Sequence, residues 1–91
     1  MKHQKVTEHD LLRMFKELHA IKRARERYGL HLGVDTLYKI GEYIRNREGR
    51  RVERRSNTIS VWDVEVQGEI VRVVYSKTWR FPVTFLLREE G

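Results

Sequence analysis

Apolar residues in the first third of the chain recur at the three- and four-residue spacing of one helical face. These positions are Leu11, Met14, Phe15, Leu18 and Ile21. We expect this stripe to pack into the core. Continuing it unchanged would bury Lys22 and Arg25, so the contact face is expected to rotate toward Ala24 and Tyr28 near the end of the helix.

Capping residues predict the ends of this helix and of a second one. Thr7 is suited to the N-cap of the first helix, and Gly29 predicts its end near residue 28. A second helix is predicted from Asp35 as its N-cap to Gly49 as its terminator. Its inward positions are Leu37, Ile40, Tyr43 and Ile44. The interior Gly41 weakens the helix and indicates close packing on a neighbour.

β-Branched and aromatic residues dominate the second half of the chain, and turn signals recur there. Four strands are predicted, near residues 51–56, 58–66, 69–76 and 82–87. Gln67 and Gly68 predict a short hairpin, because glycine adopts the positive φ that such turns require. The economical arrangement is an antiparallel meander under one helical layer, an α+β fold of two N-terminal helices on a four-stranded sheet.

The length and composition of the chain indicate how many domains it forms. The chain has 91 residues, of which 40% are hydrophobic, and this suits one small domain over residues 1–91. Within it we expect a loose arm at 1–6, a helical part at 7–48 and the sheet at 50–88. No apolar run approaches the ~18 residues of a membrane span, and no signal peptide is apparent. We therefore expect a cytoplasmic protein without a membrane partner.

The positive charge gathers in two segments. The net charge is +6, yet residues 22–27 alone carry +3 and residues 45–55 carry +4. The second segment holds six arginines, Arg45, Arg47, Arg50, Arg51, Arg54 and Arg55. Guanidinium groups bind phosphate bidentately and stack on bases, so this patchiness favours a surface that binds RNA or another nucleic acid. The alternative is an ordinary solvated surface.

Several kinds of catalytic site lack their residues. The chain has no Cys, so thiolate chemistry and Cys-based zinc sites are excluded. No two of its four His residues lie four positions apart with a Glu between them, which is the spacing that binds zinc on a helix. No Gly-rich phosphate loop or nucleophile elbow is present. We expect neither a metal site nor a cofactor.

One polar helix face remains a candidate for chemistry. On a helix, Arg23 and Glu26 each lie within ~40° of His19, with Arg27 on the same side. The imidazole of His19 can exchange a proton near neutral pH, and the two arginines can hold a phosphate. The alternative is that Glu17 and Glu26 only offset the arginines and that His19 is a boundary residue.

The segments HAIKRARERYGL and SNTISVWDVEVQGEIVRVVYSKTWRFPVTFLL give the chain a family resemblance over residues 19–87. The chain resembles small phage- and toxin-associated members of the barnase, EndoU, colicin and RelE-like ribonuclease superfamily. The resemblance implies an αα-ββββ domain that cuts RNA without a metal, or a descendant that only binds through the same surface. It implies that His19, Arg23 and Arg27 are the functional helix residues and that Tyr75, Lys77 and Thr84 are polar residues at the end of the sheet.

A ribonuclease of this type must move the proton of the 2′-hydroxyl and stabilise charge on the phosphoryl oxygens. His19 suits the first task, and Arg23 and Arg27, with Arg54 or Arg55, suit the second. A second acid–base group has to be Tyr75, Lys77 or His31. Trp79 lies in a predicted strand connection, where it is suited to stack a base, anchor a partner protein or cap the sheet.

Two further functions stay open beside an RNA-cutting toxin. One is a non-catalytic phage or mobile-element protein that binds and inhibits a host protein or nucleoprotein complex in the host-cell cytoplasm. The other is a plain nucleic-acid-binding accessory domain. Protein partners in these cases are an antitoxin or a host target, and the sequence leaves the oligomeric state open.

Overall fold

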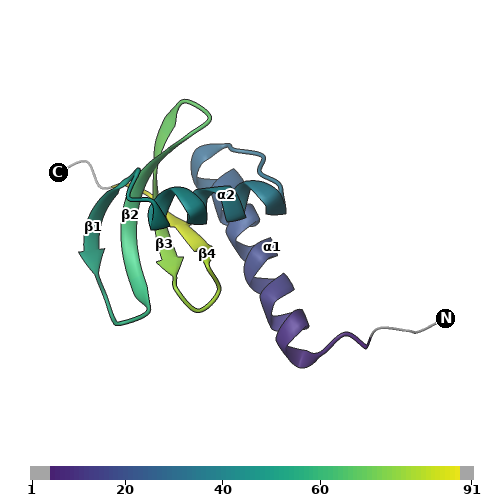
Figure 1. Cartoon of the computed structure of the whole chain (residues 1–91). Helices are drawn as coiled ribbons and strands as arrows, with labels where there is room; N and C mark the ends of the chain where they lie inside the picture. Colours follow the sequence, from purple (N-terminus) through teal and green to yellow (C-terminus); the bar gives the residue numbers. More distant parts are fainter. Residues whose placement is uncertain (1–4, 89–91) are drawn as a thin grey trace.

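The protein consists of two helices followed by a four-stranded antiparallel sheet (Figure 1). The computed structural model describes residues 5–88, so most of the arm expected at 1–6 lies outside the described residues. The elements are α1 (Glu8–Tyr28), α2 (Val34–Arg45), β1 (Arg50–Arg54), β2 (Ile59–Val66), β3 (Glu69–Ser76) and β4 (Phe81–Leu86). The strands lie in the sheet in chain order, which confirms the expected α+β meander.

Short turns explain why consecutive strands pair. Gln67 and Gly68 both have positive φ, 52° and 82°, so a two-residue turn joins β2 to β3 as expected. The connection from β3 to β4 ends at Arg80, which also has a positive φ of 67°. Such turns leave no room for a crossover, and a meander follows.

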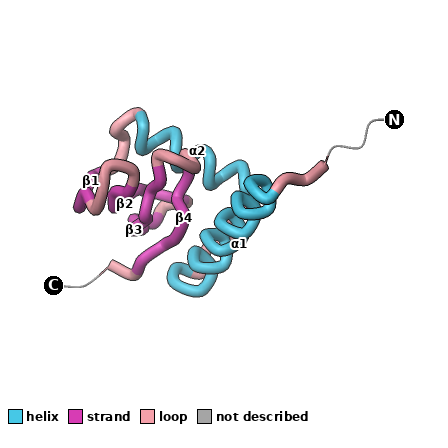
Figure 2. Tube along the Cα trace, turned by 90° about the horizontal axis from the view of Figure 1, so that it is seen from below, coloured by secondary structure: helices cyan, strands magenta, loops and turns pink. Residues whose placement is uncertain are grey.

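Both helices pack on the same core. α1 runs along β4, and α2 crosses to contact both β4 and β2, as Figure 2 shows from below. The core is built from Ala20, Ala24, Leu37, Ile40, Ile44, Trp62, Val71, Val73, Tyr75, Phe81 and Phe85. β1, at the far edge from α1, contributes no member to it. The side chains of β1 are therefore left for other contacts.

The stripe expected to bury α1 is exposed instead. The relative exposure is 46% for Leu11, 47% for Met14, 68% for Phe15 and 60% for Leu18. The helix packs on β4 through another face, where Ala20 and Ala24 are fully buried. The small side chains of Ala20 and Ala24 let the helix approach the strand closely. The face that carries them therefore packs toward the sheet. The predicted rotation toward Ala24 and Tyr28 is confirmed, and Ile21 at the end of the stripe packs against the core, but the predicted burial of the other four stripe residues is wrong.

The C-terminal end of α1 is fastened to β4 by two polar side chains. The Tyr28 hydroxyl donates a hydrogen bond to the carbonyl of Leu86 at 2.5 Å, and the Arg27 guanidinium donates to the carbonyl of Phe85. At the other end of the helix, Thr7 and Asp10 form a reciprocal capping box, as the sequence indicates. The hydrogen bonds from Thr7 lower the pKa of Asp10.

The second helix differs from its prediction at both ends. Gly33, not Asp35, is the N-cap, and the helix ends at Arg45 rather than continuing toward Gly49. Tyr43 is 43% exposed instead of inward. Close packing at Gly41 is confirmed, since an added Cβ would lie 2.3 Å from the carbonyl oxygen of Arg80. No helix within residues 5–88 is long and apolar enough to cross a membrane.

On the sheet face away from the helices, Asp63 forms a bidentate ion pair. Arg72 Nε donates to Oδ1 at 2.9 Å and its Nη2 donates to Oδ2 at 3.1 Å, while Arg88 Nε lies 3.8 Å from Oδ2. The Asp63 side chain is only 7% exposed. The hydrogen bonds from Arg72 lower the pKa of this carboxyl. The pair links β2 to β3 in the middle of the sheet.

Asp63→Asn is expected to lower the free energy of unfolding by about 2 kcal/mol at neutral pH, because a charge-assisted pair is removed. Since folding lowers the pKa of Asp63, its contribution is present above the pKa of the unfolded carboxyl, about 3.9, and is lost as the pH falls below that value. Chemical denaturation at pH 7 and pH 3 measures both effects. The variant should lose less stability on acidification than the wild type. An equal loss in both proteins would contradict the assignment.

Candidate nucleic-acid interface

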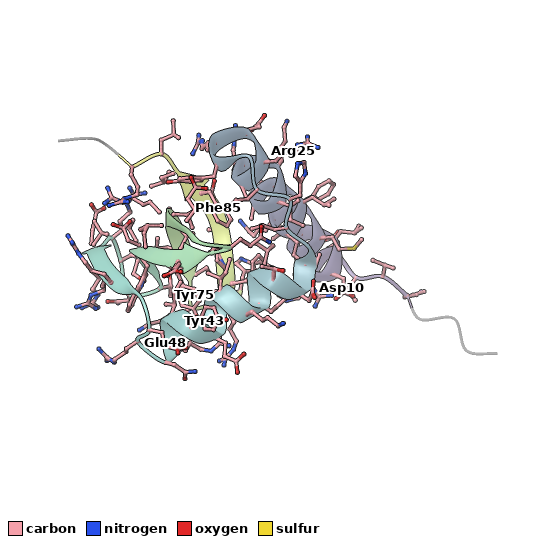
Figure 3. All side chains as sticks on the ribbon, turned by 90° about the horizontal axis from the view of Figure 1, so that it is seen from above. Asp10, Arg25, Tyr43, Glu48, Tyr75 and Phe85 are labelled. Carbon is pink, nitrogen blue, oxygen red and sulfur yellow. The ribbon has the colours of Figure 1, made fainter. Side chains whose placement is uncertain are left out.

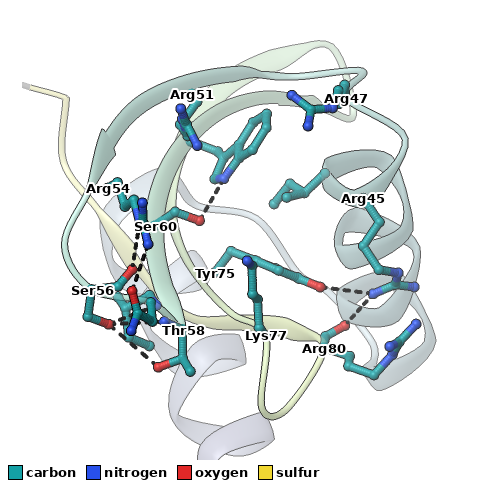
Figure 4. A pocket seen from close by; sticks show the side chains of 14 residues that line it. Arg45, Arg47, Arg51, Arg54, Ser56, Thr58, Ser60, Tyr75, Lys77 and Arg80 are labelled. Carbon is teal, nitrogen blue, oxygen red and sulfur yellow. Dashed lines mark hydrogen bonds between the residues drawn. The ribbon is translucent and has the colours of Figure 1, made fainter.

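A hollow of about 410 Å³ lies on the concave side of β1 and β2, at the C-terminal end of α2 (Figure 4). Six cationic residues line it: Arg45, Arg47, Arg51, Arg54, Lys77 and Arg80. The other lining residues are Ile44, Ser56, Asn57, Thr58, Ile59, Ser60, Trp62 and Tyr75. We call this hollow the arginine pocket. None of the described lining residues is acidic, so its charge is of one sign.

A β-bulge brings two arginines of β1 to the same side. Arg51 pairs with Trp62 and Arg54 pairs with Ser60, and the register shifts between Arg51 and Glu53. In a regular strand, residues three apart point to opposite faces. The extra residue at the bulge restores a common direction, because Trp62 and Ser60 are two apart on β2. Both guanidinium groups therefore line the arginine pocket.

Two of the arginines are held by neutral partners. Arg45 Nη1 donates to the Tyr75 hydroxyl at 3.2 Å and to the carbonyl of Arg80 at 3.0 Å. Arg54 donates to the side-chain oxygen of Asn57 at 2.7 Å and more weakly to the carbonyl of Ser56 at 3.3 Å. These contacts fix the positions of the guanidinium groups without cancelling their charge.

The cations of the arginine pocket form no ion pair with any carboxylate in residues 5–88. The two predicted arginines that do not line the pocket are in a different situation. Arg55 pairs with Glu53 at 2.6 Å, and Arg50 lies opposite Asp63 in the sheet register. The segment 45–55 thus divides into pocket arginines and arginines that lie beside acidic residues.

The predicted catalytic residues do not come together. Tyr75 and Lys77 line the arginine pocket, whereas His19 lies beside β4, with Nε2 3.4 Å from the Thr84 hydroxyl. Arg23 pairs with Glu26 at 3.0 Å, and Arg27 is bonded to the β4 backbone. Both guanidinium groups therefore lie near the imidazole but already contact protein acceptors.

His19 also has an unfavourable electrostatic environment for binding a proton. Partial removal of water from the imidazole, and then the charges of Arg23, Arg27 and Lys22, lower its pKa below the ordinary value. The ring is thus largely neutral at pH 7. His31, the alternative acid–base histidine, is exposed in the connection between the helices and lines neither hollow.

Trp79 has a structural contact that the sequence did not predict. Its ring is half-buried and stacks on His9 of α1, with ring centroids 4.8 Å apart and planes inclined by 23°. Lys16 Nζ lies 5.9 Å from the centroid of the same ring. Trp79 therefore joins the β3–β4 connection to α1 and lies outside the arginine pocket.

Sequence reasoning found four of the pocket arginines and Lys77, but it missed Arg80. Arg80 reaches the pocket because the backbone of the β3–β4 connection approaches α2 at Gly41, a contact between distant residues that no local sequence pattern marks. The polar residues Asn57, Thr58 and Ser60 were also missed as lining residues, because a turn between predicted strands gave no reason to assign them to a site.

Other ligand chemistry has little support in residues 5–88. No group of three or more His, Asp or Glu side chains in that range is placed to hold a metal ion. A scan against protein-family models, a search of curated proteins and a search of solved structures each find no match for this chain. The function must therefore be inferred from the chemistry of the arginine pocket.

Proposed function

We propose that this domain binds single-stranded RNA in the arginine pocket. The observation that carries the proposal is the convergence of six cationic side chains from α2, the α2–β1 connection, β1 and the β3–β4 connection on one hollow without a described carboxylate. Gathering like charges costs free energy unless an anion lies between them. A phosphodiester backbone supplies such anions at regular intervals.

The shape and the neutral groups of the pocket favour a single strand. A hollow of about 410 Å³ lies within the range of small-ligand sites, ~300–1,000 Å³, and is suited to a nucleotide splayed out of a chain. Asn57, Thr58 and Ser60 add hydrogen-bonding groups beside the cations. Such groups suit base edges and the 2′-hydroxyl, and the 2′-hydroxyl distinguishes RNA from DNA. An RNA-binding role also agrees with a cytoplasmic location.

Fluorescence anisotropy with a labelled single-stranded RNA tests the proposal. If the pocket neutralises about four phosphates, a plot of the logarithm of the association constant against the logarithm of the salt concentration should have a slope of about −3. The same sequence as DNA, and as a duplex, should bind more weakly. Absence of RNA binding at low salt would refute the proposal, and equal affinity for DNA would refute the RNA preference.

His19→Ala is expected to leave RNA affinity unchanged within twofold. The imidazole lies in a separate hollow beside β4, and no residue lines both hollows. The same anisotropy titration, with circular dichroism as the control for folding, measures the effect. A large loss of affinity in the folded variant would return His19 to the site and contradict the assignment to the arginine pocket.

A second candidate function, cleavage of the bound RNA without a metal, is favoured by the hydrogen bond from Arg45 to Tyr75 beside Lys77. In such a reaction the 2′-oxygen loses its proton and attacks the adjacent phosphorus, and the departing 5′-oxygen gains a proton. Arginines of the pocket stabilise the phosphoryl oxygens. This candidate agrees with the family resemblance but transfers the acid–base work from His19 to Tyr75 and Lys77.

Incubation of the RNA in EDTA, followed by gel analysis of the products, distinguishes the two functions. Cleavage that leaves a cyclic phosphate and is lost in Tyr75→Phe or Lys77→Ala supports the enzyme. Binding without cleavage refutes the second candidate and leaves a non-catalytic RNA-binding protein.

A further inference from the structure

Within residues 5–88, exposed large apolar side chains gather on α1, away from the arginine pocket. Leu11, Leu12, Met14, Phe15 and Leu18 are all between 46% and 68% exposed. Three of them, Leu12, Phe15 and Leu18, line a shallow hollow together with Val83 and Thr84 of β4. A contiguous apolar face on a small and highly charged domain is typical of a surface that another chain covers.

The spacing of the exposed side chains is that of a helix pair. Glu8, Leu11, Phe15, Leu18, Lys22 and Arg25 follow one another at alternating steps of three and four residues, and all are exposed. This is the a/d spacing of a coiled-coil seam. Leu12 and Met14 flank the seam on its two sides. The seam is apolar in its middle and charged at its ends.

The charges at the two ends of the seam are opposite in sign. Glu8 lies in the first turn of α1, whereas Arg25 lies in its last turn and Lys22 about one turn earlier. Two copies of α1 in antiparallel orientation place Glu8 of each copy beside Lys22 and Arg25 of the other. A parallel pair would place like charges together, and its helix dipoles would also be aligned unfavourably.

The fold leaves this part of α1 accessible. In Figure 1 the N-terminal half of the helix extends away from the sheet, and Figure 3 shows Asp10 and Arg25 toward opposite ends of it. Lys16, His19 and Lys22 line the adjacent hollow, where no described lining residue is acidic. The acidic first turn of a second copy complements Lys16 and Lys22 at this border.

We propose that two copies of this chain associate through the exposed stripe of α1 as an antiparallel, two-fold symmetric pair. The contact is isologous, so it closes on itself and adds no further copies. Phe15 lies at its centre, with Leu11 and Leu18 on either side. The arginine pocket shares no residue with this surface, so each copy keeps its pocket, and the dimer and the RNA-binding function can fail separately.

Sedimentation equilibrium of the full chain tests the association. The wild type is expected to be a dimer, and the double variant Phe15→Gln, Leu18→Gln is expected to be a folded monomer with unchanged RNA binding. Ile70→Thr is the matched control, because Ile70 is 43% exposed on β3 outside the stripe and should leave the dimer intact. A wild type that stays monomeric up to its solubility limit, or a dimer that survives the double variant, would overturn the proposal.

Charge reversal tests the orientation and the identity of the partner. Glu8→Lys alone places cations together and should weaken the dimer by at least tenfold. Adding Lys22→Glu and Arg25→Glu to it reverses both ends and should restore association. A parallel pair gains nothing from the combined change, so failure to restore the dimer, with the helix content unchanged by circular dichroism, would overturn the antiparallel arrangement.

Discussion

Replacing both Arg51 and Arg54 with glutamine is expected to weaken the binding of single-stranded RNA by on the order of 10²-fold, since each guanidinium–phosphate contact contributes about tenfold. The bulge in β1 turns both side chains into the arginine pocket, where no described carboxylate offsets them. The salt dependence should also become shallower, by ~0.7 in slope for each phosphate that is no longer neutralised. Anisotropy titrations at three or more salt concentrations measure both quantities.

The chain offers a matched control for this prediction. Arg50→Gln with Arg55→Gln removes the same charge from the same segment, but Arg50 lies opposite Asp63 and Arg55 pairs with Glu53, outside the pocket. This control should lose only the small long-range part of the attraction. If both double variants lose affinity equally, binding depends on total charge, and the pocket is not the site.

Gly41→Ala is expected to lower the free energy of unfolding by about 3 kcal/mol, at the upper end of the cost of overpacking. The added methyl group would lie 2.3 Å from the carbonyl oxygen of Arg80, a backbone atom that cannot rotate aside. In an unconstrained helix the same change would stabilise by up to about 1 kcal/mol, so the sign of the effect is informative. Urea denaturation measures it.

Gly33→Ala is a suitable comparison for Gly41→Ala. Its added Cβ would meet only the side chain of Asp35, which is exposed and can move. The cost there should stay at about 1 kcal/mol, the usual effect of a poorer N-cap. A Gly41 variant as stable as the wild type would show that the β3–β4 connection shifts freely.

The elements of this fold were predictable because their signals are local. The capping box of Thr7 and Asp10 needs only residues three apart, and the hairpin at Gln67 and Gly68 needs only two adjacent ones. Strand order followed from short connections. Gly41 was predicted to mark a close approach, but its partner, Arg80, is distant along the chain, and no local pattern identifies it.

The exposure of the N-terminal part of the α1 stripe could not be predicted, because an apolar stripe has the same spacing whether it faces its own core or another chain. The choice was decided by Ala20 and Ala24, which fit against β4 where the larger Phe15 would not. The burial of Glu17, to whose carboxylate the Tyr38 hydroxyl donates at 2.9 Å, is equally a product of tertiary packing. Burial and this hydrogen bond raise the pKa of Tyr38.

The candidate site was partly predictable, because the clustering of arginines survives folding, whereas the arginines beside His19 contact protein acceptors that the sequence did not reveal. Charge density between residues 45 and 55 indicated a cationic surface, and four of its arginines line the pocket. Which arginines do so depends on sheet register. His19 was grouped with Arg23 and Arg27 by helical spacing, but Glu26 and the β4 backbone occupy those arginines.

Because of the bulge in β1, the charge of the pocket depends on how many residues separate Arg51 from Arg54, as well as on which residues stand there. Deleting Val52 would leave the two arginines, Arg51 and Arg54, two positions apart in a regular strand, so both would still face the pocket. Deleting one more residue between them would make them adjacent and would turn one of them to the face that carries Asp63. We therefore expect the effect of an insertion or deletion on RNA affinity to alternate with the number of residues inserted or deleted in this short strand. Substitutions at Val52 are expected to leave RNA affinity unaffected.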